Sequence, residues 1–120
     1  MPRNLRRGAA SEDLAAAYLL ELGYTIITRN YYAPGSEIDI VAMDGDTLVF
    51  IEVKNRKKGA WATPEEGVSL DKQRRLWDAA GYYVSENLGK ECEMRFDVIA
   101  IQDGNLRHHK DAFRPAYRCS

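Results

Sequence analysis

The chain has 120 residues, a formal net charge of −1 and hydrophobic residues at 45% of its positions. This length supports one domain, and this composition is typical of a globular protein rather than a disordered one. No apolar run reaches the roughly 18 residues of a membrane span, and no secretory signal peptide opens the chain. Cys92 and Cys119 lack metal-binding spacing. We therefore expect two free thiols in a cytoplasmic protein that does not enter membranes.

The first segment is basic and the second is helical. Residues 1–9 contain three arginines and predict a basic, flexible arm. The Ala- and Leu-rich residues 11–22 predict a helix that ends at Gly23. Glu12 shares the face of the apolar side chains of this helix, so we expect it to point toward the core. The alternative is a first-turn Glu favoured only by the helix dipole.

The most informative stretch is residues 36–56. Two apolar, β-branched runs flank Asp44-Gly45-Asp46, a pattern that predicts a β-hairpin. Both arms are apolar on both faces, which is typical of strands that are covered on both sides of a sheet. A charged side chain in such a strand needs a partner, so each one is a candidate functional residue.

Four charged residues interrupt the two arms: Glu37, Asp39, Glu52 and Lys54. Because side chains alternate along a strand, Glu37 shares a face with Asp39, and Glu52 with Lys54. A two- or four-residue loop places Asp39 opposite Glu52, and Lys54 opposite Glu37. A three-residue loop would put Asp39 and Glu52 on opposite faces.

Facing carboxylates at Asp39 and Glu52 favour a metal site. At about 5 Å they repel by roughly 3 kcal/mol, and a hard divalent cation removes this cost. Oxygen ligands suit Mg²⁺ or Mn²⁺. Such a site binds a phosphate oxygen and activates a water, while Lys54 stabilises the developing charge. The plain alternative is a solvated salt bridge at the end of a strand.

The rest of the chain supplies the other elements of a sheet and its cover. Residues 24–32 predict a strand before the hairpin. The long loop 57–68 contains Trp61, which could stack on a base or cover an edge of the core. Ser69 caps a predicted helix that runs to Asn87.

Residues 95–101 predict a further strand, and residues 106–110 predict an edge strand after a turn. His108 and His109 point to opposite faces of that strand, so we expect ordinary surface histidines. The core order is α-β-β-β-α-β, with a right-handed β-α-β crossover between parallel strands. The predicted fold class is therefore α/β with mixed α+β character, a mixed sheet with helices on both faces.

Basic residues gather in three places, which allows phosphate contacts despite the near-neutral sum. Lys72 begins the second helix, where the helix dipole disfavours a cation, so we expect it to contact phosphate or the carboxylates. A solvated surface is the alternative for each cluster. The candidate nucleic-acid contacts are Arg7, Arg56, Lys57, Lys58, Lys72, Arg74 and Arg75.

Asp39, followed after the hairpin by Glu52-Val53-Lys54, resembles the PD-(D/E)xK nuclease motif. Residues 35–42 and 50–56 are more similar still to the YraN-like family of small bacterial proteins. A wider resemblance, to Holliday-junction resolvases of the same superfamily, spans residues 7–101. It includes Gly23-Tyr24, Arg29-Asn30, Lys72-Gln73-Arg74-Arg75 and Arg95-Phe96-Asp97-Val98. Two positions differ from these patterns: Ile38 stands where the motif has Pro, and Asn55 where Thr is usual.

This resemblance implies a single nuclease-like domain, residues 1–120, with a restriction-endonuclease-like fold. It implies an Mg²⁺- or Mn²⁺-dependent endonuclease that acts on DNA, including branched or junction DNA. Asp39, Glu52 and the helix-borne Glu12 would hold the metal, Lys54 would be catalytic, and Glu37 and Trp61 would be accessory. Related resolvases are dimers, which favours an isologous homodimer. The alternative is a nucleic-acid-binding module that keeps the fold without the chemistry.

Overall fold

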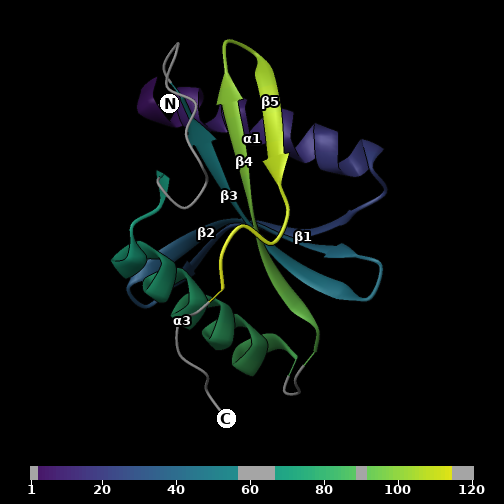
Figure 1. Ribbon diagram of the computed structural model, residues 1–120, viewed down its shortest axis with the longest axis vertical. Helices are drawn as coiled ribbons and strands as arrows, with labels where there is room; N and C mark the ends of the chain where they lie inside the picture. Colours follow the sequence, from purple (N-terminus) through teal and green to yellow (C-terminus); the bar gives the residue numbers. More distant parts are fainter. Residues whose placement is uncertain (1–2, 57–66, 89–91, 115–120) are drawn as a thin grey trace.

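The computed structural model describes residues 3–56, 67–88 and 92–114, with side chains from residue 10 onward. The predicted order of elements is confirmed, including the edge strand at the end (Figure 1). The elements are α1 (Arg3–Glu21), β1 (Thr25–Ala33), β2 (Ser36–Asp44), β3 (Thr47–Asn55), α3 (Leu70–Asn87), β4 (Met94–Gln102) and β5 (Asn105–His109).

The five strands form one mixed sheet in the order β1-β2-β3-β4-β5. Neighbouring strands run antiparallel except β3 and β4, which are parallel. The connection between these two strands contains α3, so the predicted β-α-β unit is confirmed. Apolar side chains of α1 pack on one face of the sheet and those of α3 on the other. This arrangement confirms the predicted fold class and is consistent with a restriction-endonuclease-like fold.

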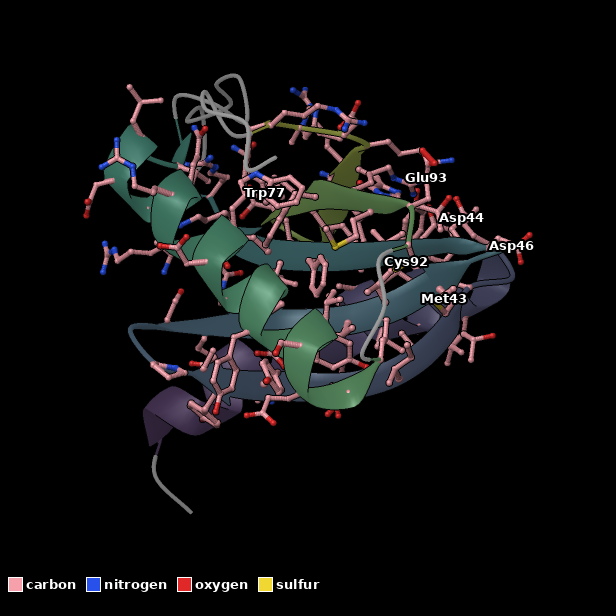
Figure 2. All side chains as sticks on the ribbon, turned by 90° about the horizontal axis from the view of Figure 1, so that it is seen from below. Met43, Asp44, Asp46, Trp77, Cys92 and Glu93 are labelled. Carbon is pink, nitrogen blue, oxygen red and sulfur yellow. The ribbon has the colours of Figure 1, made fainter. Side chains whose placement is uncertain are left out.

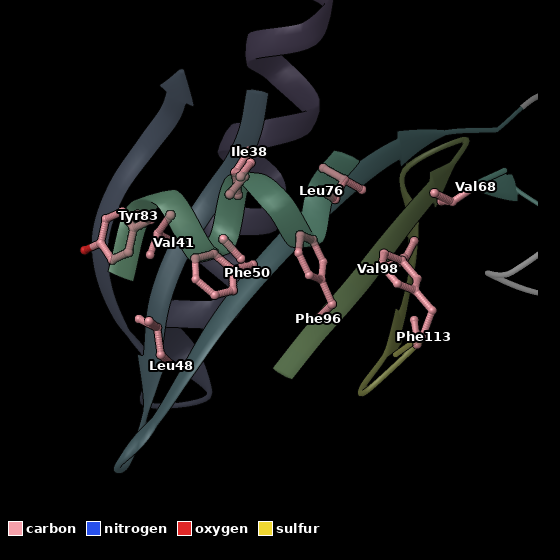
Figure 3. Close-up of a cluster of buried hydrophobic side chains, with 13 residues drawn as sticks. Ile38, Val41, Leu48, Phe50, Val68, Leu76, Tyr83, Phe96, Val98 and Phe113 are labelled. Carbon is pink, nitrogen blue, oxygen red and sulfur yellow. The ribbon is translucent and has the colours of Figure 1, made fainter. Parts of the chain in front are cut away.

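Two dehydrated layers hold the helices to the sheet. In the layer under α1, Ala15 and Leu19 pack against strand residues such as Ile51. The layer under α3 contains all three phenylalanines of the chain, with the Phe96 ring centroid 5.5 Å from that of Phe50 and 5.0 Å from that of Phe113 (Figure 3). Because both faces of the central strands are covered, any charged group there must find a partner within the protein.

Helix α1 begins eight residues earlier than the sequence pattern predicts. Residues 3–9, expected as a flexible arm, form the first turns of the helix. Arginine and alanine have high helix propensity, so the apolar helix that starts near Ser11 continues backward through this segment. The prediction treated basic composition as a sign of flexibility, although basic residues are compatible with an exposed helical turn.

Helix α3 begins and ends where the sequence predicts. The Ser69 hydroxyl accepts a hydrogen bond from the backbone N–H of Lys72 at 3.1 Å, which is an N-cap. The helix runs to Asn87 and buries the predicted apolar stripe of Leu76, Ala80 and Tyr83. Within the described part of the chain, neither helix is long and apolar enough to cross a membrane.

The β2–β3 hairpin has the predicted register, with Asp44 opposite Thr47 and Val41 opposite Phe50. Figure 2 shows Asp44 and Asp46 at its tip, with Glu93 beside them. The two-residue loop therefore has the parity that brings Asp39 and Glu52 to the other, open end of the hairpin.

A buried ionic network joins β4, β5 and α1. Asp97, whose side chain is 0% exposed, accepts hydrogen bonds from Arg95 Nε at 2.9 Å, His108 Nε2 at 2.7 Å and the backbone N–H of Asp111 at 2.9 Å. Burial alone would raise the pKa of Asp97, but the hydrogen bonds from His108, Arg95 and Asp111 outweigh it and lower that pKa. The Asp97 carboxylate is therefore ionised and fully satisfied inside the core.

The prediction of an ordinary surface histidine is wrong for His108. Its side chain is only 4% exposed, and its Nδ1 lies 3.0 Å from the Tyr18 hydroxyl of α1. Because the Asp97 carboxylate only accepts, His108 Nε2 carries the proton, and in the neutral ring Nδ1 accepts from Tyr18. The His108 ring can be buried at the edge strand because the Asp97 carboxylate and the Tyr18 hydroxyl each contact one of its nitrogens.

Candidate active site

Asp39 and Glu52 lie where β2 and β3 separate. The β2–β3 pairs end at Ile40–Ile51, one residue before the predicted Asp39–Glu52 pair. Beyond that point Asp39 Oδ2 accepts a hydrogen bond from the backbone N–H of Val53 at 2.8 Å. The carboxylate therefore takes the place of a backbone carbonyl, which fixes its position beside Glu52.

Asp39 carries a strongly perturbed proton affinity. Burial, and next the negative charge of Glu52, raise its pKa to about 8, although the hydrogen bond from Val53 N–H opposes this shift. The charges of Glu12 and Glu37 raise this pKa further. Glu52 is itself only 6% exposed. A buried carboxylate, Glu52, and a half-buried one, Asp39, thus adjoin each other, as predicted for the pair.

Glu37 and Glu12 extend the acidic cluster on two sides. The Glu12 side chain is only 13% exposed, in agreement with the prediction that it points inward from α1. Burial, followed by the charges of Glu12 and Glu52, raises the pKa of Glu37, and the positive charge of Lys72 opposes this. Elements from both faces of the sheet therefore meet here: α1 brings Glu12, and α3 brings Lys72.

Lys54 lies beside Glu52 rather than opposite Glu37. Its Nζ is 3.4 Å from Glu52 Oε2, and its side chain is 28% exposed. The described β2–β3 ladder ends at Ile40–Ile51, so neither of the predicted pairs, Asp39–Glu52 and Glu37–Lys54, is part of it. Glu52 and Lys54 share a face of β3, as alternation predicts, and the ammonium group stands at the rim of the carboxylate pair.

The sequence analysis gave no role to Arg29, which also lies at this cluster. Arg29 Nη2 is 2.8 Å from Asp13 Oδ1 and 3.5 Å from Glu12 Oε1. The same guanidinium has a buried Nε with no hydrogen-bond partner among the described residues. The sequence could have indicated this role, because Arg29 interrupts the apolar pattern of β1.

A second polar contact ties α1 to the end of β3. The buried Ser11 hydroxyl donates a hydrogen bond to Asn55 Oδ1 at 2.6 Å. Ser11 precedes Glu12 and Asn55 follows Lys54, so this bond fixes the separation of two candidate site residues. Asn55 is the position where the sequence departs from the usual Thr, and here the amide oxygen accepts a hydrogen bond.

The predicted nucleic-acid contacts occupy different environments. Arg74 and Arg75 are exposed on α3, and Arg75 Nε pairs with Asp71 at 3.2 Å. Arg56 is half-buried, and its guanidinium packs so closely on Gly67 that a Cβ there would lie 1.8 Å from Nη2. Lys57, Lys58, Trp61 and the side chain of Arg7 lie outside the described residues, as does Cys119, while Cys92 is a half-buried free thiol.

The donor set at the open end of the hairpin fits a hard divalent cation with water. Mg²⁺ takes one or two protein carboxylates and keeps several water ligands, and Asp39 and Glu52 offer a half-buried and a buried carboxylate. Across residues 10–56, 67–88 and 92–114, no three His, Cys, Asp or Glu side chains are already arranged to hold a metal ion. Glu12 therefore does not stand with the other two as a preformed third ligand.

Comparison with known proteins shows which family this sequence belongs to. The model of the uncharacterised protein family UPF0102 matches residues 11–101, a span that contains Glu12, Asp39, Glu52 and Lys54. The chain belongs to the UPF0102 family. This membership confirms the YraN-like family predicted from the sequence.

Full-length relatives in the UPF0102 family come from distant bacteria. A UPF0102 protein of Syntrophus aciditrophicus is 41% identical over 98% of this chain and 95% of its own length. One from Rhodococcus opacus is 43% identical over 94% of this chain and 100% of its own length. One from Thermodesulfovibrio yellowstonii is 46% identical over 88% of this chain and 94% of its own length. The chain therefore corresponds to nearly the whole of these UPF0102 proteins.

Proposed function

We propose that this protein is a metal-dependent endonuclease of the PD-(D/E)xK superfamily that cleaves a phosphodiester bond in DNA. The observation that carries the proposal is the adjoining carboxylate pair Asp39 and Glu52 with Lys54 at its rim. The pKa of Asp39 is raised to about 8, a perturbation that is costly in a purely structural residue. A carboxylate pair of this kind beside a lysine supplies the parts needed for phosphoryl chemistry.

Each residue has a separate role in this proposal. Mg²⁺ or Mn²⁺ held by Asp39 and Glu52 would supply Lewis-acid chemistry, which activates water and neutralises phosphate charge. Lys54 keeps one donor toward Glu52 and can direct its other donors to a phosphate oxygen as negative charge develops. Burial of the pair excludes bulk water, which strengthens each of these electrostatic contacts.

The substrate and the assembly follow from the resemblance to Holliday-junction resolvases. We extend the proposal to branched or junction DNA and to a homodimer, because an isologous dimer presents two equivalent sites to a two-fold symmetric junction. Exposed Arg74 and Arg75 on α3 would contribute phosphate contacts, and we place the activity in the cytoplasm.

The decisive experiment is a cleavage assay on single-stranded, duplex, flap and four-way-junction DNA with Mg²⁺ or Mn²⁺. Wild type is expected to cut at least one of these substrates. Glu52→Gln, which keeps the side-chain shape, is expected to abolish cleavage. Asp46→Asn is the matched control, because Asp46 lies exposed at the opposite end of the same hairpin. Cleavage that survives in Glu52→Gln would assign the activity to another site or to a contaminant.

A non-catalytic nucleic-acid-binding module is the second candidate. It is favoured by the finding that the described side chains include no preformed three-ligand metal group. Binding of any of the four DNA forms by wild type, without cleavage in either metal, would select this candidate. Lys54→Ala separates the two further: it should abolish cleavage and largely spare affinity if the site is catalytic.

A further inference from the structure

Asn30 has a backbone conformation that is unusual for a strand. Its φ is +54°, whereas the other described non-glycine residues with positive φ, Asp103 and Asp111, lie in a turn and just beyond β5. Left-handed backbone is unfavourable for L-residues because Cβ crowds the following carbonyl oxygen, and Asn tolerates it better than most. A residue held in this region within a strand marks a place where the surrounding structure requires it.

The strand β1 changes faces at Asn30. Arg29 points to α1, where its Nη2 lies 2.8 Å from Asp13. Tyr31 points to α3, where its ring centroid lies 5.1 Å from that of Tyr83. In a regular strand residues 29 and 31 would share one face. The left-handed residue between them therefore rotates the strand by half a turn relative to regular alternation.

The neighbouring strand β2 changes faces at the same level. Ile40 packs in the layer under α1, whereas Ile38 packs in the layer under α3 (Figure 3). The β1–β2 pairs include Arg29–Ile40 and Tyr31–Ile38, and the described ladder omits the intervening pair of Asn30 with Asp39. The regular alternation assumed for Glu37 and Asp39 in the sequence therefore does not hold across Asp39.

This double rotation coincides with the residue that matters most in the candidate site. At the level of Asn30, Asp39 directs its carboxylate to the backbone of the next strand and accepts from Val53 N–H at 2.8 Å. In a regular strand that side chain would stand perpendicular to the sheet. We infer that Asn30 is a positioning residue, whose left-handed backbone turns Asp39 into contact with Val53 and so beside Glu52. Only its consequence for metal rests on the proposed function.

The first test needs no metal. Hydrogen exchange and the chemical shift of the Val53 amide report the bond to Asp39 directly. Asn30→Gly, which adopts positive φ readily, should keep Val53 protection within about twofold. Asn30→Val, whose β-branched side chain opposes positive φ, should lower protection by about tenfold or more. Asp103→Val introduces the same backbone conflict in the β4–β5 turn and should leave Val53 unchanged.

The second test measures Mn²⁺ affinity of the full chain by titration calorimetry. Asn30→Val should bind about tenfold more weakly than wild type, and Asn30→Gly and Asp103→Val should match wild type. If Asn30→Val does not fold, Asn30→Ala provides a milder conflict with the same expected direction. Unchanged Val53 protection in the folded Val or Ala variant would overturn the inference. If wild type binds no Mn²⁺ while Val53 protection still falls as expected, the proposed metal chemistry fails and the role of Asn30 stands.

Discussion

Two carboxylates of the same sheet, Asp97 on β4 and Asp39 on β2, show how the surroundings of a residue decide its charge. Asp97 has donors from Arg95, His108 and the Asp111 backbone, and its pKa is lowered despite complete burial. Asp39 has one N–H donor and a second carboxylate nearby, and its pKa rises to about 8. The first carboxylate stabilises the fold, whereas the second is poised for a ligand that would neutralise it.

Replacing Asp39 by Asn should stabilise the metal-free protein. The folded-state pKa of Asp39 lies above its unfolded value, so wild type loses stability as pH rises from about 4 to about 8, while the unfolded carboxyl ionises and the folded one resists. Asp39→Asn lacks this loss and should exceed wild type by roughly 5 kcal/mol at pH 8, with little difference near pH 4. Urea denaturation between about pH 4 and pH 8 measures this difference in the free energy of unfolding. If the variant is less stable than wild type at pH 8, Asp39 is a structural residue.

Replacing Asp97 by Asn should have the opposite effect. An amide leaves the largely buried Arg95 charge with only its second carboxylate partner, Asp44 at 3.1 Å, which costs about 3–5 kcal/mol at neutral pH. The folded-state pKa of Asp97 is lowered, so its contribution is present above the unfolded pKa and is lost as pH falls through the folded value. The stability gap between wild type and Asp97→Asn should therefore narrow below about pH 4, as urea denaturation would show. A gap independent of pH would mean that the carboxylate charge contributes nothing.

At the scale of elements, each helix packs on the sheet and also contributes a charged residue to the acidic cluster. Apolar side chains of α1 and α3 fix the sheet from its two faces, and each helix also brings a charged residue to its open end, Glu12 and Lys72. The exposed side of α3 carries Arg74 and Arg75. That side of α3 makes no contribution to the core, so it can be altered without disturbing the site.

Arg74→Ala combined with Arg75→Ala should weaken DNA binding without unfolding the protein. Each phosphate contact that is lost should reduce the slope of log affinity against log salt by about one unit. Leu70→Ala, another exposed position of α3, provides a matched control that leaves the charge unchanged. Binding measured by fluorescence anisotropy at several salt concentrations tests this. An unchanged slope would remove this side of α3 from the DNA interface.

Regular elements were predictable from the sequence because local rules determine them. Ser69 caps α3 as expected, and the parity of the Gly45-Asp46 loop sets the register that brings Asp39 toward Glu52. The alternation rule assumes a regular strand, so it could not show the left-handed Asn30. The burial of His108 depends on Tyr18, 90 residues away, which no local pattern encodes.

At the scale of the whole molecule, the fold holds its acidic cluster at a point where three strands and two helices meet. Glu12, Glu37, Asp39 and Glu52 come from α1, β2 and β3, and Arg29, Lys54 and Lys72 come from β1, β3 and α3. Repulsion at this point acts against every element that contributes to it. A cation bound there should stabilise the entire domain, because the elements separate when the protein unfolds.

Mg²⁺ should therefore raise the melting temperature of wild type and leave Asp39→Asn unaffected. At ten times the dissociation constant, a ligand that binds only the folded state adds about 1.4 kcal/mol. For a domain of this size that corresponds to roughly 5 °C. Without metal, Asp39→Asn should melt at a higher temperature than wild type, because the variant lacks the Asp39 charge that repels Glu52. Calorimetric scans of both proteins with Mg²⁺, and with K⁺ at equal ionic strength, separate specific binding from screening. Equal shifts in both proteins would mean that the ion acts elsewhere, and the carboxylate pair would then have no metal to hold.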